Sequence, residues 1–392
     1  MQNNPSFLWL PSWYPNKLAP YDGDFIRRHA QAVSVFNEVM LIYVIRDING
    51  IVTRDVSVEV YKKDKLTEKI IYYYSEKKKL ILLDKLFSEI KYRRLYKRTV
   101  KEYIGQKGKP AIVHVHVALK AGIIAGWIRN RFHIPYIITE HSTIFLPEEK
   151  NKFVDFPLYF RLAWKKIMKQ ASGISVVSHY LGEQIKKHLS IEYIVIPNVV
   201  DTTIFKPIDH PVSGKMRFIH ISSLNCQKNP EAIFHAFALV KNQYQNLYLD
   251  IFGPASPHLE QLVTELELQL FVNFHPEIPQ NELVQYVQQS RALILYSRYE
   301  TFGCVIIEAN ACGIPCIVSN IPVMHEIVED CVNGIFVPGE NPRDLANKIK
   351  WFIDNYHGFN KVNIAEGSLS KYSYEVVAKQ FLQWYASVLK NG

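Results

Sequence analysis

The chain has no long hydrophobic run, no internal repeat and no low-complexity segment. No stretch reaches the roughly 18 uninterrupted apolar residues that a membrane-spanning helix needs. The first ten residues, MQNNPSFLWL, also lack the basic region and apolar core of a secretory signal. These absences argue against a transmembrane, fibrous or solenoid protein. We expect a cytoplasmic protein that is either soluble or peripheral at the inner face of a membrane.

Cysteine is scarce, with 5 in 392 residues. The cysteines form no CxxC pair and no cluster with histidine at the spacing of a zinc site. Their odd number and scattered positions predict reduced thiols rather than a disulfide framework. The five are Cys226, Cys304, Cys312, Cys316 and Cys331.

Acidic residues are outnumbered, and the excess of cations is local. The sequence has 37 Asp and Glu against 46 Lys and Arg, a net charge of +9, and many of the cations fall within residues 77–109, interleaved with apolar residues. This pattern predicts a basic amphipathic helix, which can bind an anionic membrane surface or pack on its own domain with its charges in solvent. No recognised nucleic-acid module accompanies the charge, so we expect no nucleic-acid partner. The cations are Lys77, Lys78, Lys79, Lys85, Lys91, Arg93, Arg94, Lys97, Arg98, Lys101, Lys107 and Lys109.

Short apolar runs alternate with longer helical patterns in both halves of the chain. This alternation is typical of parallel strands in doubly wound α/β sheets, and the length suffices for two domains. We expect Rossmann-like domains at 1–200 and 201–373, and a helix at 374–392 that can pack back on the first domain. The expected strands are Phe7–Leu10, Val39–Ile45, Ala111–Val115, Tyr136–Thr139, Ile174–Val177, Tyr193–Ile196, Arg217–Ile221, Tyr248–Phe252, Phe271–Phe274, Ala292–Tyr296, Cys316–Ser319 and Ile335–Val337, and the expected helices are 25–36, 118–130, 157–170, 179–188, 229–241, 280–289, 303–312 and 341–355.

The strongest chemical signal is a pair of glutamates, Glu300 and Glu308, at a strand-to-helix junction. Ligands of doubly wound sheets bind beyond the carboxyl ends of the strands, which here would form the walls of a cleft between the domains. A nucleoside diphosphate there would meet the free N–H groups at Phe302, Gly303 and Cys304, and a carboxylate could accept from ribose hydroxyls. The alternative is an ordinary capped helix with exposed glutamates.

The residues around this pair resemble the donor-binding motif of glycosyltransferase family 4, whose members are retaining transferases with the two-domain GT-B fold. The resemblance covers most of the chain, with residues 46–110 as the exception. It extends upstream to Pro197, Asn198 and Asp201 and to Tyr21–Ala30 (YDGDFIRRHA). The motif itself rests on Glu300, Phe302, Gly303, Glu308, Ala309, Gly313, Pro315, Glu326, Asn333, Gly334, Val337 and Gly339.

The resemblance implies a role for each matching donor-site residue. Glu308 would bind the donor ribose, Glu300 would contact the donor sugar, and Lys228 would neutralise the diphosphate. Thr301 would belong to the donor-binding loop. Gly23 would bring backbone close to the donor. Ser223 stands where the family usually has arginine, so a second phosphate cation must come from elsewhere, with Arg27 and Arg298 as candidates.

Histidines are expected at two further parts of the site, next to the transferred sugar and near the nucleotide base. The resemblance places His141, at the end of a strand, next to the transferred sugar, which makes it a candidate catalytic residue together with Glu300 and Lys228. His114 and His116 alternate on the preceding strand and are more typical of structural residues. We expect the nucleotide base near His275, Pro276 and Glu277.

The resemblance favours a front-face reaction, in which the departing phosphate deprotonates the acceptor and the protein supplies position and charge. No DxD-type dipeptide stands at a strand end, so we expect no metal and no cofactor. The donor would be a UDP- or GDP-sugar, and the acceptor a glycan or lipid-linked saccharide in bacterial surface polysaccharide synthesis. A sugar-nucleotide 2-epimerase and a non-catalytic nucleotide-sugar binding protein are the alternatives. Base, sugar, acceptor and oligomeric state stay open.

Overall fold

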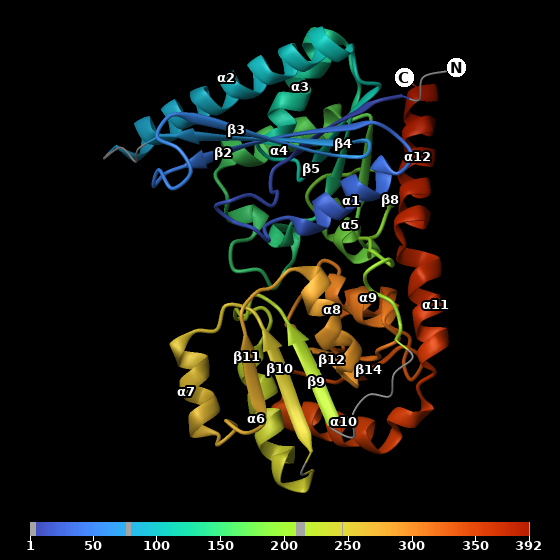
Figure 1. Cartoon of the computed structure of the whole chain (residues 1–392). Helices are drawn as coiled ribbons and strands as arrows, with labels where there is room; N and C mark the ends of the chain where they lie inside the picture. Colours follow the sequence, from blue (N-terminus) through green and yellow to red (C-terminus); the bar gives the residue numbers. More distant parts are fainter. Residues whose placement is uncertain (1–4, 76–79, 209–215, 245, 392) are drawn as a thin grey trace.

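The computed structural model describes residues 5–75, 80–208, 216–244 and 246–391, which form two sheets with helices on both faces (Figure 1). The first sheet and its helices comprise β1 (Phe7–Pro11), α1 (Asp24–Ser34), β2 (Val39–Asp47), β3 (Val56–Lys63), β4 (Leu66–Tyr74), α2 (Ile81–Lys107), β5 (Ile112–His116), α3 (Ala121–Phe132), β6 (Tyr136–Glu140), α4 (Leu158–Gln170), β7 (Gly173–Val176), α5 (His179–Lys186) and β8 (Ile194–Val195).

The second sheet and the C-terminal helices follow after residue 215. They comprise β9 (Met216–Ile221), α6 (Pro230–Val240), β10 (Leu247–Phe252), α7 (Pro257–Glu265), β11 (Val272–His275), α8 (Gln280–Gln289), β12 (Ala292–Leu295), α9 (Cys304–Ala311), β13 (Cys316–Ser319), β14 (Gly334–Val337), α10 (Pro342–Asn355), α11 (Lys361–Tyr372) and α12 (Tyr374–Asn391). Each strand expected from the sequence has a counterpart here at nearly the same position.

The second sheet has the strand order β11-β10-β9-β12-β13-β14, with all neighbours parallel. The order reverses between β9 and β12. In doubly wound folds this reversal opens a crevice beyond the carboxyl ends of the two central strands. The first sheet, β3-β4-β2-β1-β5-β6-β7-β8, has its own reversal between β1 and β5.

The expectation of purely parallel pairing is wrong for one edge of the first sheet. β3 pairs antiparallel with β4, and the two strands are joined by the tight turn at Asp64 and Lys65. Asp64 has a φ of 53°, a left-handed conformation that aspartate tolerates better than most residues. The sequence analysis also did not predict α7 and α11.

Helix α2 covers the first sheet on the side away from the second domain (Figure 1). Its C-terminal half is anchored by buried Tyr92, Leu95, Tyr96 and Val100. Its N-terminal half leaves apolar side chains in solvent, with 54% of Leu86 and 53% of Ile90 exposed. The predicted amphipathic helix therefore packs on its own domain through its C-terminal half, whereas its N-terminal half keeps apolar side chains exposed to solvent. Lys77, Lys78 and Lys79 lie outside the described residues.

The last helix belongs in space to the first domain. α12 runs beside α1, and its Phe381 and Tyr385 are buried in one apolar cluster with Phe7 and Trp9 of β1 (Figure 1). The chain therefore passes between the domains twice. The two passages touch, since the Val200 N–H donates to the Tyr372 carbonyl at 2.9 Å.

No helix in the described part of the chain is both long and apolar enough to cross a membrane.

Candidate functional site

A cavity of about 640 Å³ lies between the two domains. Its walls come from the loops that follow β1 and β6 in the first domain and β9, β11 and β12 in the second. Most of the residues singled out from the sequence are brought together on these walls: Gly23, His141, Ser223, Lys228, Glu277, Glu300, Thr301, Phe302, Gly303, Cys304 and Glu308.

Two residues expected near the base lie off these walls. His275 does not line the cavity: its Nε2 lies 3.1 Å from Asp250 Oδ1, and its imidazole stacks on Phe252 with ring centroids 4.5 Å apart. Pro276 does not line the cavity either, whereas Glu277 and Ile278 do. A contact with a bound base can therefore come from the loop after His275, and Phe252 itself lines the cavity.

The domains contact each other directly around the cavity. Ser178 Oγ donates to the Thr301 carbonyl at 2.8 Å, and Tyr21 Oη donates to the Glu277 carbonyl at 3.2 Å. The motif residue Glu326 accepts hydrogen bonds from the first two N–H groups of α5, each at 2.7 Å. These contacts hold first-domain and second-domain loops against one another.

Gly23 is the last residue of the loop between β1 and α1, at a position that only glycine fits. Its φ is 68°, and a Cβ atom there would lie 2.8 Å from the backbone of Trp13. It starts α1 without a side-chain cap. The first N–H groups of α1 are therefore not satisfied by a capping side chain.

The second helix that starts at the cavity is α9. Gly303, with a φ of 116°, precedes it, and no side chain caps its N-terminus. Uncapped N–H groups and the positive end of the helix dipole favour an anion there. Burial raises the pKa of the Cys304 thiol to about 12, so this side chain stays protonated and is a poor nucleophile.

Lys228 and Glu300, which both line the cavity, form an ion pair. Lys228 Nζ donates to Glu300 Oε1, which also accepts from Ser297 Oγ at 2.8 Å. The loops that carry them are joined by further bonds, including Gln227 Nε2 to the Tyr299 carbonyl at 2.9 Å. The ammonium group of Lys228 is therefore held in place in the cavity that the start of α9 also lines.

Glu308 is paired with a residue that the sequence analysis missed. Arg28 of α1 donates from Nη1 to Glu308 Oε1, and both side chains are buried. Burial raises the pKa of the Glu308 carboxyl, and the charge of Arg28 offsets part of that rise. The sequence feature that could have indicated Arg28 is the pair of adjacent arginines, Arg27 and Arg28, just after the loop that contains Gly23. They stand in a helix that begins at the cleft.

The two arginines proposed to replace the missing family arginine do not reach the cavity. Arg27 Nε lies 3.0 Å from Glu68 Oε1, within the first domain. Arg298 pairs with Glu340, and its Nε donates to the Cys226 carbonyl at 3.1 Å. Among the expected diphosphate cations, only Lys228 lines the cavity.

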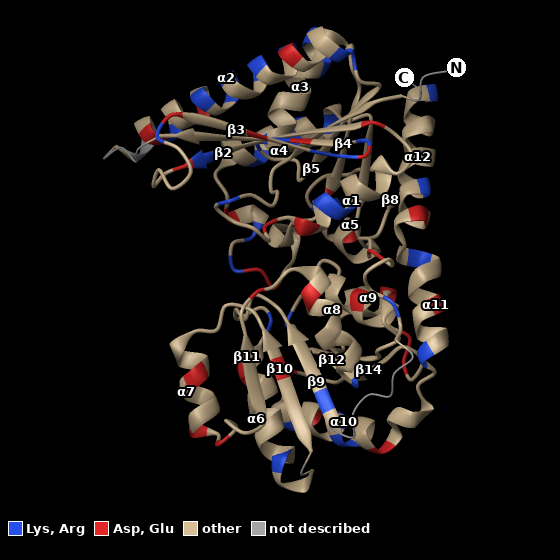
Figure 2. Cartoon of the chain, viewed as in Figure 1, with Lys and Arg blue, Asp and Glu red and all other residues tan. Residues whose placement is uncertain are grey.

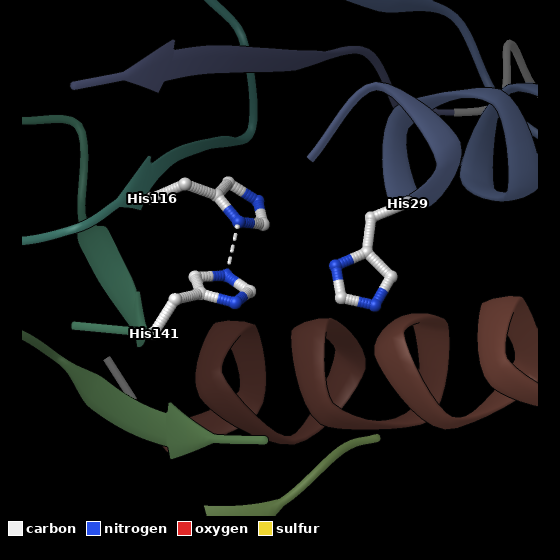
Figure 3. Close-up of side chains that lie close together, drawn as sticks. All are labelled: His29, His116 and His141. Atoms are coloured by element: carbon white, nitrogen blue, oxygen red, sulfur yellow. Dashed lines mark hydrogen bonds between the residues drawn. The ribbon is translucent and has the colours of Figure 1, made fainter. Parts of the chain in front are cut away.

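His141 lies within a buried group of histidines (Figure 3). Its Nε2 is 3.1 Å from His116 Nδ1, and His29 of α1 faces the pair, with Nε2 3.0 Å from the Pro197 carbonyl. Burial lowers the pKa of all three, to about 4 for His29, so the group is neutral at pH 7. His114, also buried, hydrogen bonds to Thr139 at 2.7 Å and does not line the cavity. The group fixes the orientation of His141 at the cavity wall.

These three histidines are also the only group with metal-site spacing within the described residues, with ligand atoms within 4.8 Å of one another. A ligating histidine normally donates its second ring N–H to an acceptor. His29 has the Pro197 carbonyl, but His116 Nε2 and His141 Nδ1 have no hydrogen-bond partner in the described structure. The surroundings therefore fit neutral, mutually packed imidazoles better than a metal centre.

Two Rossmann-like domains that face each other across such a cavity define the GT-B fold. The structure shares this fold with sucrose-phosphate synthase from Thermosynechococcus elongatus, with a TM-score of 0.77 and 20% identity over 99% of this chain and 100% of the other. It is similar also to Anabaena HepE in complex with UDP and glucose, with a TM-score of 0.70 and 16% identity over 98% and 100% of the chains.

Family models identify the chain more narrowly. The model of glycosyl transferases group 1 matches residues 202–367, and the model of glycosyltransferase family 4 matches residues 52–204. The chain belongs to the glycosyltransferases of group 1 and family 4 that these two models describe.

Similar sequences carry related names. The D-inositol 3-phosphate glycosyltransferase of Frankia alni is 26% identical over 71% of this chain and 74% of that protein. The alpha-monoglucosyldiacylglycerol synthase of Streptococcus pneumoniae is 24% identical over 69% and 64%, and an uncharacterised glycosyltransferase of Methanocaldococcus jannaschii is 26% identical over 62% and 66%. The matched region thus spans just under two thirds of the last two proteins.

Proposed function

We propose that the protein transfers a sugar from a nucleoside-diphosphate sugar to a glycan or lipid-linked acceptor, with retention of anomeric configuration. The observation that carries the proposal is that Lys228, Glu300, Glu308 and the uncapped start of α9 all line one cavity. The lining offers a cation and helix-end amides for a diphosphate, and carboxylates for the hydroxyl groups of the two sugars that flank it.

Each part of the donor has a proposed partner. Glu308 accepts from the ribose hydroxyls, while Lys228 and the first amides of α9 hold the diphosphate. Glu300, Thr301 and His141 surround the transferred sugar, and Gly23 admits its close approach. Because an ammonium and a helix N-terminus already neutralise the phosphates, the proposed reaction uses no divalent metal.

In the proposed front-face reaction, the acceptor oxygen forms its bond to the anomeric carbon on the side from which the diphosphate departs. The bond between that carbon and the phosphate oxygen breaks, and the acceptor proton passes to the leaving diphosphate. Lys228 stabilises the charge that develops on the leaving group. The other residues orient the reactants, which by itself lowers the barrier.

UDP is the favoured nucleotide over GDP, on the strength of HepE, whose complexes contain UDP and UDP-glucose. Glu277, Ile278 and Phe252 are the candidates for contacting the base, since they line the cavity beside the second sheet.

A lipid-linked acceptor in bacterial surface polysaccharide synthesis would bring the protein to the cytoplasmic face of a membrane. The name of the Streptococcus relative, a glucosyldiacylglycerol synthase, supports a lipid acceptor. Lys and Arg line α2 (Figure 2), whose N-terminal half also exposes Leu83, Leu86 and Ile90 on one helical face. Apolar insertion flanked by cations is the chemistry of peripheral binding to anionic lipids.

The proposal is tested with UDP, GDP, ADP, CDP and their common sugar conjugates, with EDTA present throughout. A thermal shift with one nucleotide family is expected. NMR of the bound donor over time then separates the candidates: slow hydrolysis with retained anomeric configuration supports a transferase. Inversion at the sugar C2 without acceptor would instead identify an epimerase, and an unchanged donor a binding protein.

A further inference from the structure

Arg28 and Glu308 stand 280 residues apart, in different domains, and form an ion pair beside the cavity. Arg28 leaves 7% of its side chain exposed and Glu308 leaves 4%. Arg28 Nε also lies 3.1 Å from Asp24 Oδ2, one helical turn earlier in α1. The guanidinium is thus held by a carboxylate of its own helix while it reaches into the second domain.

Gln280 connects the same groups from a third helix. Its Nε2 donates to Glu308 Oε1 at 3.3 Å and to Asp24 Oδ2 at 3.4 Å. α1, α8 and α9 are therefore linked around one carboxylate, and two of the three belong to the second domain. Such a network fixes the orientation of Glu308.

The contacts of Glu308 are all on one oxygen. Arg28 and Gln280 both bond to Oε1, and no hydrogen bond within the described residues reaches Oε2. Glu308 lines the cavity. The remaining oxygen is thus the one available to a hydroxyl of a bound ligand.

We propose that Arg28 is a positioning residue for the donor ribose: from the first domain it holds Glu308 of the second so that Oε2 accepts a ribose hydroxyl. The inference rests on the proposed donor function of the cavity. Its electrostatic part follows from burial, because a deeply buried carboxylate without a cation takes up a proton and becomes a weaker acceptor.

A consequence is that ribose recognition depends on both domains. When the domains separate, Glu308 loses its cation, and its affinity for a hydroxyl falls. Donor binding therefore favours the domain arrangement in which Arg28 reaches Glu308.

The test measures calorimetric affinities for UDP and GDP and for their 2′-deoxy counterparts. Wild type should bind the ribonucleotide about tenfold or more tightly than its 2′-deoxy counterpart, because the deoxy ligand lacks one hydrogen bond to a charged acceptor. E308Q and R28Q should each lose most of this preference, and R28Q/E308Q should lose no more than E308Q alone. R27Q is the matched control: the adjacent arginine pairs with Glu68 inside the first domain, so R27Q should keep the wild-type preference.

The pH dependence separates positioning from a merely structural role. Without Arg28, Glu308 takes up a proton at higher pH, so the affinity of R28Q for UDP should begin to fall at a higher pH than that of wild type. R28Q leaves a buried carboxylate unpaired and can fail to fold. R28K then provides the second test, because lysine keeps the positive charge but lacks the planar guanidinium group with its several N–H donors. The ribose preference of R28K should lie between those of wild type and E308Q.

The outcomes distinguish the two proposals. If E308Q loses the ribose preference while R28Q or R28K keeps it in full, Glu308 binds ribose without help and the inference about Arg28 is overturned. If wild type binds neither UDP nor GDP, or if E308Q keeps the ribose preference, the proposed donor site fails and the inference fails with it.

Discussion

Lys228 Nζ donates a hydrogen bond to Glu300 Oε1 although 72 residues separate them in the sequence. The bond joins the loop after β9 to the loop after β12, the two strands between which the order of the second sheet reverses. The ammonium group is partly exposed and the carboxylate is buried. The charge that would meet a phosphate is thus held in place before any ligand arrives.

Replacing this lysine should weaken nucleotide binding. Lys228→Ala removes the one expected diphosphate cation on the cavity wall, so the affinities for UDP and GDP should fall about tenfold or more, measured by calorimetry. Lys379→Ala is the control, since Lys379 is an exposed cation in α12 paired with Glu375. Equal affinities of Lys228→Ala and wild type would mean that the phosphates bind elsewhere.

Restoring the arginine that the family usually carries should have the opposite effect. Ser223 lines the cavity, as does the start of α9. Ser223→Arg should tighten UDP binding up to about tenfold at low salt, and the gain should shrink as salt is added. Ser370→Arg, at an exposed site in α11, adds the same charge away from the cavity. A matching gain in that variant would show that net charge alone is responsible.

The buried histidines predict how stability depends on pH. Burial lowers the pKa of His29 from 6.5 to about 4, so between these values the unfolded chain binds more protons than the folded one. Stability should therefore rise with pH from about 4 to 6.5 and level off above. His29 alone contributes about 3 kcal/mol to this change.

Urea unfolding at pH 5 and pH 7.5 measures the effect. His29→Gln keeps a donor for the Pro197 carbonyl but does not titrate, so it should show a smaller difference between the two pH values. An identical difference in His29→Gln and wild type would refute the assignment of a neutral, buried imidazole.

The exposed apolar side chains in the N-terminal half of α2 predict how the protein binds membranes. Leu86→Ser with Ile90→Ser removes two half-exposed apolar side chains from one helical face, so sedimentation with vesicles containing anionic lipid should drop severalfold at low salt. Leu270→Ser is the control, because Leu270 is 85% exposed in the second domain, away from α2. Sedimentation that is absent in wild type, or equal in all variants, would count against membrane docking through α2.

The sequence predicted the central strands well because they are buried on both faces. Parallel strands of this kind are nearly continuous apolar runs, as in β1 and β12, which are buried at every residue. The hairpin of β3 and β4 was missed for the complementary reason. β3 lies at the edge of the sheet and is largely exposed, with Val58 and Val60 in solvent, and its sequence alternates between apolar and polar residues instead of forming an apolar run.

Most residues of the predicted donor site could be placed at the cavity from the sequence, because they match the motifs of the family resemblance and stand on loops at strand ends. Arg28 and His29 could not, since their partners Glu308 and Pro197 come close only when two sheets and the helices between them have folded. An arginine in a helix gives no sign of whether it faces solvent or a carboxylate of another domain. The position of the helix relative to the cleft decides this.

The two backbone passages between the domains bear on how the molecule can move. Val200 and Ser373 lie side by side as a parallel bridge, and the next residue, Tyr374, bonds through Oη to Gln31 of α1 at 2.9 Å. Two adjacent covalent connections resist twisting and sliding far more than one flexible linker does. The cleft can then open and close mainly by rotation about a single axis through residues 200 and 373, with the largest displacement at the rim farthest from α12. Removal of α12 would abolish one of the two connections and free the remaining degrees of rotation.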